Sequence, residues 1–252
     1  MRNAIHPFQN KSITVVEYIA EFGSKLDAYG NERARFLARC PACGNGMHTK
    51  GESNPEVDGI FSHQPNRDVF CPLKESAEKP YEILPHVDED PNKTKALRSS
   101  FFKHWKLHYN LMKSYLKVID IFDFINLIKY ADKKNIWSYR HIEEEQIPYI
   151  FLVLKEYQPV RNKQKFIRRD WLRFWFDSRI RGLEDLWIKT NGNWLLIKAT
   201  YSNPRNGGIP NQAQLKNTEI VTVNLDFLND EEPILPSFVI DKMQKEFSEE
   251  VE

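Results

Sequence analysis

The residues with the clearest chemical signal form the segment Cys40-Pro41-Ala42-Cys43-Gly44. Two residues between the cysteines place both sulfurs on one side of a tight turn, where backbone N–H groups can point at them and a glycine lets the turn close. Cys71 is the third and last cysteine, and His63 is the histidine we favour as the fourth ligand, with His48 as its competitor. A closed tetrahedral shell of such soft ligands suits a structural zinc ion. The predicted ligands are Cys40, Cys43, His63 and Cys71.

A pair of cysteines two residues apart also occurs in redox proteins, where the pair follows a strand and opens a helix. Residues 40–80 instead contain many Pro, Gly and Asn residues and few large apolar ones. Such a segment buries too little surface to offset the entropy lost on ordering, so it needs a metal ion or a neighbouring element. The composition therefore favours structural zinc over a redox site.

Charged residues are sorted along the chain, although the formal net charge is only +1. Basic residues concentrate between 93 and 118 and between 161 and 181, whereas residues 219–252 are mainly acidic. This sorting indicates a polyanionic partner such as DNA or RNA, or an acidic tail that covers the basic stretches. The plain alternative is two solvated helix faces and an ordinary acidic tail. The predicted phosphate contacts are Lys103, Lys106, Lys113, Arg161, Lys163, Lys165, Arg168, Arg169 and Arg173.

Aromatic residues alternate with arginines in the second basic stretch. Arginine binds phosphate through two parallel hydrogen bonds, and aromatic rings stack on unpaired bases. If the stretch is a helix, Trp171 and Trp175 lie about one turn apart and arginines flank them. The alternative is that the aromatic side chains pack in the core and leave the arginines outside.

Residues 33–73 resemble the N-terminal zinc-finger-like region of the competence protein CoiA family. That family has a Cys-Pro-x-Cys knuckle, a spacer, a short element of an aromatic, a small residue and His, and a later Cys. The corresponding elements are Cys40-Pro41-Ala42-Cys43, Ile60-Phe61-Ser62-His63 and Cys71. The likeness covers roughly the first 80 residues, about a third of the chain.

The resemblance implies a DNA-handling context, such as DNA uptake, a mobile element or phage defence, and a following domain of the restriction-endonuclease type. A nuclease site of that type needs an Asp on one strand, then Glu or Gln, one residue and Lys on the next, with Mg²⁺ held by the carboxylates. The nearest match is Asp185 with Lys198, and Leu196 stands where the second carboxylate belongs. This departure favours a non-enzymatic protein that needs no Mg²⁺, with Asp185 and Lys198 as the only candidate catalytic residues.

The elements that must position these residues are of mixed type. The pattern predicts a strand over 12–19 and an amphipathic helix from 96 to about 131, single or broken near Asp120. It predicts a helix or buried strand over 147–157 and a hairpin over 186–201 around Asn191-Gly192-Asn193. A strand over 219–228 and a helix over 236–250 follow, and Glu143–Glu145 is expected at a solvated helix end. The predicted fold is α+β, with a zinc-knuckle module (1–88) before a larger domain (89–252) that holds a long amphipathic helix and a small antiparallel sheet.

The composition excludes several classes of protein. Hydrophobic residues make up 41% of 252 residues, which is enough for a core and excludes wholesale disorder. No apolar run approaches the roughly 20 residues of a membrane span, and the first residues lack the apolar core of a secretory signal. We therefore expect a cytoplasmic protein with no membrane partner.

These patterns lead to one leading function and two alternatives. The leading hypothesis is a zinc-containing nucleic-acid-binding protein that handles DNA. The first alternative is a Mg²⁺-dependent nuclease, active or degenerate. The second is a protein–protein adaptor of a multi-component defence complex, which docks a partner through its acidic C-terminal tail.

Overall fold

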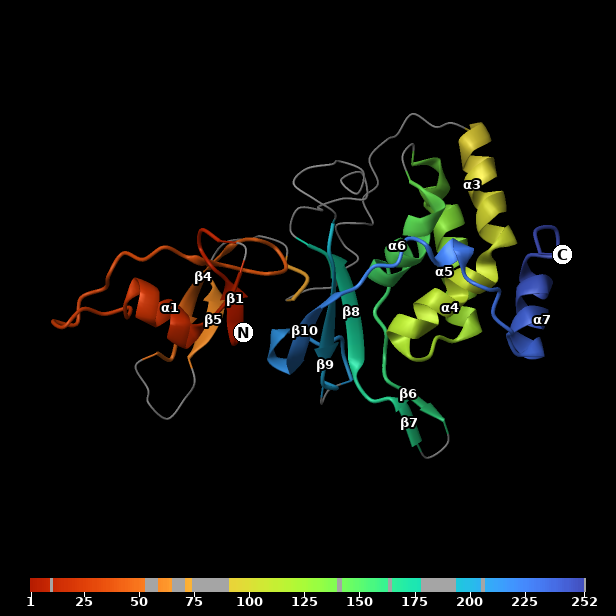
Figure 1. Ribbon diagram of the computed structural model, residues 1–252. Coiled ribbons are helices and arrows are strands. Elements are labelled where there is room, and N and C mark those ends of the chain that lie inside the picture. The colour runs from red at the N-terminus through yellow and green to blue at the C-terminus, as the bar shows by residue number, and fades with distance from the viewer. Residues whose placement is uncertain are drawn as a thin grey trace. The chain divides into compact units, whose positions relative to one another are not determined.

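The chain folds as two compact units, Met1–Glu75 and Ser76–Glu252 (Figure 1). The computed structural model describes residues 1–252 except 10, 53–58, 65–70, 74–90, 140–141, 163–164, 178–193, 205–206 and 252. The domain boundary predicted at residue 88 lies outside the described residues.

The N-terminal unit is built on a five-stranded antiparallel sheet with the strand order β2-β1-β3-β4-β5. The strands are β1 (Asn3–Ile5), β2 (Ser12–Thr14), β3 (Ala38–Arg39), β4 (Gly46–Lys50) and β5 (Ile60–His63). One helix, α1 (Val15–Phe22), follows β2 directly. The long connections between these short strands explain why hydrophobic periodicity did not reveal the sheet.

The strand predicted over 12–19 is wrong beyond Thr14, where α1 begins. Thr14 and Glu17 form a capping box: the Glu17 N–H donates to Thr14 Oγ1 at 3.2 Å, and the Thr14 N–H donates to the Glu17 carboxylate at 2.8 Å. These bonds satisfy backbone donors that a helix start leaves unpaired. The buried side chains of α1, Val15 and Tyr18, lie three residues apart, which is helical spacing.

Helices and a small sheet make up the C-terminal unit. Its helices are α3 (Pro91–Lys103), α4 (Trp105–Leu116), α5 (Ile121–Lys133), α6 (Ile147–Val153) and α7 (Ser237–Glu246). Its three-stranded sheet has the order β10-β9-β8, from β8 (Trp171–Phe176), β9 (Leu196–Tyr201) and β10 (Leu215–Val221). A separate hairpin pairs β6 (Val160–Asn162) with β7 (Lys165–Arg168). The α+β class is confirmed, and none of the described helices is long and apolar enough to cross a membrane.

The single long helix predicted from residue 96 is wrong, because the stretch forms α3, α4 and α5. Helix α4 ends at Leu116, and the next residue, Lys117, has a φ of 64°, which lies in the left-handed region. The break predicted near Asp120 is confirmed: Asp120 caps α5, and its carboxylate accepts a hydrogen bond from the Phe122 N–H at 2.9 Å. A second break lies at His104, between α3 and α4, and no Pro or Gly in the sequence predicts it.

The stretch from 161 to 176 forms strands β6, β7 and β8, so the helical interpretation is wrong. Both faces of β8 are covered. Leu172, Phe174 and Phe176 belong to the main core, and Trp171 and Trp175 are buried on the other side. The prediction that these aromatic side chains are core residues is confirmed. The segment 147–153 is a helix, and the expected final helix is present as α7. The strand predicted over 219–228 is wrong beyond Val221, because β10 covers Leu215–Val221 and Phe227–Asn229 form a 3-10 turn.

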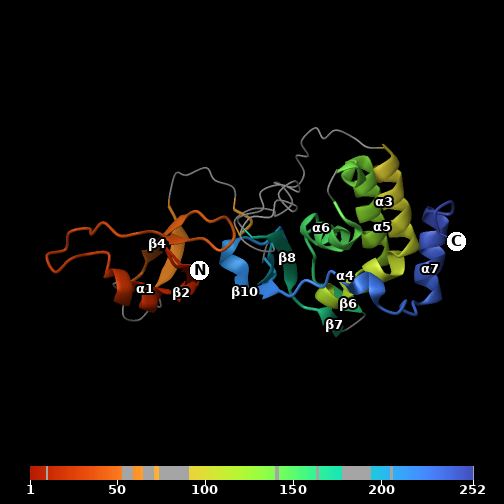
Figure 2. The ribbon, with the colours of Figure 1, turned by 45° about the horizontal axis from the view of Figure 1, so that its top comes forward.

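The core of the C-terminal unit is aromatic. Phe101 and Phe124 stack with their ring centroids 6.1 Å apart. Both rings also contact Phe151, and Phe101 contacts Trp137 as well. Helix α7 lies alongside α5, as two views of the chain show (Figures 1 and 2). The packing brings the acidic C-terminal part of the chain next to the basic helices.

One polar cluster is buried beside this core and contradicts the expectation for Glu143–Glu145. Glu144 is 9% exposed, and its carboxylate accepts hydrogen bonds from Ser100 Oγ, His104 Nδ1 (2.9 Å) and His108 Nε2 (3.0 Å). Burial raises the pKa of Glu144, but the hydrogen bonds from His108, Ser100 and His104 outweigh it and hold that pKa at about 2. The cluster ties the α3–α4 break to the 3-10 turn Glu144–Gln146 that precedes α6.

We expect Glu144→Gln to lower the free energy of unfolding by about 1–3 kcal/mol at pH 7, because buried donors lose a charged acceptor. The carboxylate of Glu144 stabilises the fold fully above its ordinary pKa of 4.5, and that contribution is lost as the pH falls to about 2. Urea unfolding across this window measures both effects. Glu145→Gln is the matched control, and an equal loss in both variants would contradict the assignment.

Candidate metal centre

The first two ligands sit in the turn that joins β3 to β4. Cys40 directly follows β3, and its N–H donates to the Asn45 carbonyl at 2.8 Å. The Gly44 N–H donates to the Cys40 carbonyl at 2.8 Å, and Gly44 has a φ of 70°, which a residue with a Cβ rarely adopts. The glycine after Cys43 therefore closes the turn, as the sequence predicted.

The sheet brings the third ligand to this turn. His63 ends β5 and pairs with Met47 on β4, so it lies one strand away from the residues that follow the knuckle. His48 pairs with Ser62 instead, and alternation along β4 places it on the opposite face from Met47. This register explains why His63, and not His48, joins the cysteines among the described residues.

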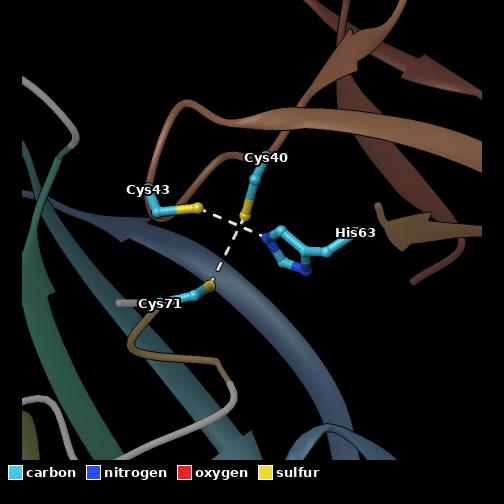
Figure 3. Close-up of side chains that lie close together, drawn as sticks. All are labelled: Cys40, Cys43, His63 and Cys71. Atoms are coloured by element: carbon cyan, nitrogen blue, oxygen red, sulfur yellow. Dashed lines mark hydrogen bonds between the residues drawn. The ribbon is translucent and has the colours of Figure 1, made fainter. Parts of the chain in front are cut away.

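Four ligand atoms converge: the Sγ atoms of Cys40, Cys43 and Cys71 and one ring nitrogen of His63 all lie within 4.8 Å of one another (Figure 3). The Sγ atoms of Cys40 and Cys71 are 3.8 Å apart, and Cys43 Sγ is 3.3 Å from His63 Nε2. A tetrahedral zinc with Zn–S bonds of about 2.3 Å holds two sulfurs roughly 3.8 Å apart. A disulfide would need about 2.05 Å, and all three cysteines are free.

The three thiols perturb one another strongly. Hydrogen bonds with Cys40 and Cys71 hold the pKa of the Cys43 thiol well below its usual range. Hydrogen bonds to Cys43 and Cys71, with burial, raise the pKa of Cys40. The hydrogen bond with Cys40 pulls the pKa of Cys71 down, but Cys43 and burial outweigh it and raise that pKa to about 12. Without a cation, one thiolate therefore suppresses ionisation of the other two.

A divalent cation removes this conflict, because it stabilises every thiolate that it contacts. Cys40 and Cys71 are fully buried, and Cys43 and His63 are half-buried, so the shell has little access to water. The buried Cys₃His group is consistent with structural zinc, which uses four protein ligands and leaves no position for a substrate. The four predicted ligands are thus the four residues that the structure brings together.

The predicted phosphate contacts divide into three groups. Five side chains are exposed and, within the described part of the chain, have no carboxylate within ion-pair distance: these are Lys103, Lys113, Arg161, Lys165 and Arg169. Lys106 forms an ion pair with Glu232, and Lys163 lies outside the described residues. Arg168 and Arg173 are buried. Sequence alone could not separate these groups, because all nine residues carry the same charge.

The two buried arginines have structural partners. Arg168 donates from one guanidinium nitrogen to the carbonyls of Leu116 (3.0 Å) and Val118 (2.8 Å), and it also donates to the Gln158 carbonyl at 2.6 Å. Arg173 is 1% exposed and forms an ion pair with Glu156 at 2.7 Å. A guanidinium with its donors used internally cannot bind a phosphate without breaking these bonds, so neither residue stays in the predicted interface.

Acidic residues from the C-terminal part pair with the basic helices. The pairs are Glu232 with Lys106, Glu246 with Lys129 and Glu250 with Arg98. Such partly exposed pairs contribute little stability each, but they neutralise charge locally. The acidic tail thus covers part of the first basic stretch, which is one of the two arrangements that the charge sorting predicted.

The candidate catalytic residues do not form a site in the described structure. Asp185 lies outside the described residues. Lys198 projects from β9, and its amine is 2.9 Å from the carboxylate of Glu219 on the neighbouring strand. This ion pair accounts for Lys198 without a metal ion or a substrate.

We expect the purified chain to carry about one zinc ion, and Cys71→Ser to lose it, because a closed four-ligand shell needs every thiolate. Loss of zinc will unfold the N-terminal unit and leave the C-terminal unit folded. Zinc content by mass spectrometry and the dispersion of amide NMR signals measure the two effects.

His48→Gln is the matched control for the metal centre and should keep both the zinc and the fold. Zinc retained at full occupancy in Cys71→Ser, or an N-terminal unit that stays folded after chelation, would refute the assignment.

Comparison with known proteins adds no relative. No protein family, no curated protein and no solved structure matches this sequence. The likeness of residues 33–73 to the CoiA family is untested by these comparisons and stays a hypothesis.

Proposed function

We propose that this chain is a zinc-containing nucleic-acid-binding protein. In this proposal zinc stabilises the N-terminal unit, and the C-terminal unit supplies the phosphate contacts. The observation that carries the proposal is the pair of hydrogen bonds from Arg168 to the carbonyls of Leu116 and Val118. They join the two basic stretches, which are far apart in the sequence.

The joined region gathers exposed cations. Lys113 lies on α4 and Lys117 comes directly after its end, and both are exposed. Arg168 ends β7 and attaches that strand to the end of α4, so that Arg169 and the β6–β7 hairpin lie beside it. Unpaired cations gathered in this way create a positive potential that attracts a polyphosphate chain.

Charge distribution favours nucleic acid over a protein adaptor. Three acids of the tail, Glu232, Glu246 and Glu250, are already paired with lysine and arginine inside the same unit, which leaves fewer acids to dock a protein partner. The exposed bases near the end of α4 and on the hairpin keep their charge. A DNA-handling role in uptake, a mobile element or phage defence follows only from the likeness to the CoiA family and is part of the proposal.

The test is fluorescence anisotropy with labelled single- and double-stranded oligonucleotides across a salt series. We expect binding that weakens steeply with salt, by about 0.9 in the log–log slope per phosphate contact on duplex DNA. Lys113→Glu and Lys165→Glu should each weaken binding and reduce the slope by about one or two contacts, because each replaces an attraction by a repulsion.

Lys245→Glu is the control for these variants, since it makes the same change in net charge on an exposed position of α7. Equal losses in all three variants would point to net charge alone. No binding of either oligonucleotide at low salt would refute the proposal and favour the adaptor alternative.

A further inference from the structure

A cavity of about 340 Å³ opens where the two basic stretches meet. It lies between the end of α4, strand β7 with the residues after it, and the face of β8 and β9. The residues that matter for its chemistry are Tyr115, Lys117, Phe166, Arg169, Lys198 and Thr200. All belong to the C-terminal unit.

The floor of the cavity is one face of the small sheet. Leu172 on β8 pairs with Thr200 on β9, and Lys198 lies two residues before Thr200 on the same face. The carboxylate of Glu219, opposite Lys198 on β10, is 2.9 Å from the lysine amine and orients it. The floor thus presents one hydroxyl and one ammonium group on rigid strands.

Arg168 fixes the walls. Its guanidinium bridges the carbonyls of Leu116 and Val118, on either side of Lys117, while Arg169 follows it in the chain. Lys117 and Arg169 both line the cavity, and both are exposed. Neither has a carboxylate partner among the described residues, so their donors are available to a ligand.

The lining selects an anion. Four cations and the carboxylate of Asp170 line the cavity. Arg168 donates to backbone carbonyls and Lys198 is paired with Glu219. Among these lining residues, Lys117 and Arg169 are therefore the cations left for a ligand. Asp170 is itself paired with Lys216, at 2.6 Å. Guanidinium and ammonium donors around a hydroxyl match the oxygens of a phosphate, which accept several charge-assisted hydrogen bonds at once.

Aromatic rings accompany the cations. Phe166 lines the cavity from β7, with the guanidinium of Arg161 3.8 Å from its ring centroid, and Tyr115 lines it from α4. Rings of this kind stack on an unpaired base, and base stacking tolerates any sequence. The volume lies at the small end of the range for ligand pockets, about 300–1,000 Å³, so the cavity suits one nucleotide and not a duplex.

We infer that this cavity binds a single phosphate-bearing nucleotide, either an unpaired nucleotide of a strand or a free one. The phosphate lies between Lys117 and Arg169 and above Thr200, and the base lies against Phe166. For the strand-bound case the inference rests on the proposed function, because it names the site at which a single strand is held.

The experiment uses the full chain and four probes: thymidine 5′-monophosphate, thymidine, and a strand of six thymidine nucleotides with and without a 5′-phosphate. Calorimetry measures the affinities. The test variant is Lys117→Asn combined with Arg169→Gln, in which asparagine tolerates the left-handed backbone at position 117. The matched control is Lys113→Gln, which removes one exposed cation from the same helix outside the cavity.

We expect the unmodified chain to bind the monophosphate at least about tenfold more tightly than thymidine, and the double variant to lose at least about tenfold of that affinity. Lys113→Gln should weaken binding of the strand and leave binding of the monophosphate unchanged. Amide NMR shifts of Lys198 and Thr200 on titration locate the ligand independently of the variants, which also guards against a variant that fails to fold.

The outcomes separate the two proposals. Strand binding that the double variant does not change, or equal affinity for the monophosphate and thymidine, overturns the pocket and leaves nucleic-acid binding intact. Monophosphate binding that shifts Thr200, with no binding of either strand, supports the pocket for a free nucleotide and overturns the proposed function.

Discussion

The N-terminal unit depends on a simple electrostatic constraint: three thiols and an imidazole share one small volume. Without a cation, ionisation of one thiol opposes ionisation of the others: the hydrogen bond with Cys40 lowers the pKa of Cys71, but the hydrogen bond with Cys43 and burial raise it to about 12. A zinc ion turns the same crowding into four attractive contacts. The strands around the site are only two to five residues long, so the sheet has little burial of its own to keep His63 beside the knuckle. We therefore expect metal binding and folding of this unit to be one process.

In the C-terminal unit the organising cation is a side chain of the protein, the guanidinium of Arg168. Buried Arg168 costs desolvation, and burial lowers its pKa, but its hydrogen bonds go to the carbonyls that end α4. Helix ends leave such carbonyls unpaired, and a cation there also interacts favourably with the helix dipole. Arg168 therefore has a structural role: its hydrogen bonds fix the backbone next to Lys117 and Arg169 at the cavity.

Local chemistry could be predicted from the sequence more fully than tertiary arrangement. The Cys40–Cys43 spacing implies the turn that the structure contains, and Asp120 capped a helix where the sequence suggested a break. The helix expected around Trp171 failed because alternating and helical spacing look alike in a short stretch that is apolar on both faces. Glu144 was expected in a solvated acidic run, because its neighbours in the sequence do not indicate that Ser100 and His108, 44 and 36 residues earlier in the chain, donate hydrogen bonds to it.

Contacts between distant parts of the chain also decide which residues of the predicted interface are free to bind phosphate. Nine lysines and arginines were expected to contact phosphate, yet Arg168 and Arg173 are internal donors and Lys106 is paired with Glu232. Sequence reports how much positive charge a segment carries, whereas a polyanion responds only to charge that is exposed and unpaired. Arg168 loses a surface role and instead holds the backbone on both sides of Lys117. Lys117 was left out of the predicted contacts, and it enters the proposed pocket through this arrangement of Arg168, which the sequence does not reveal.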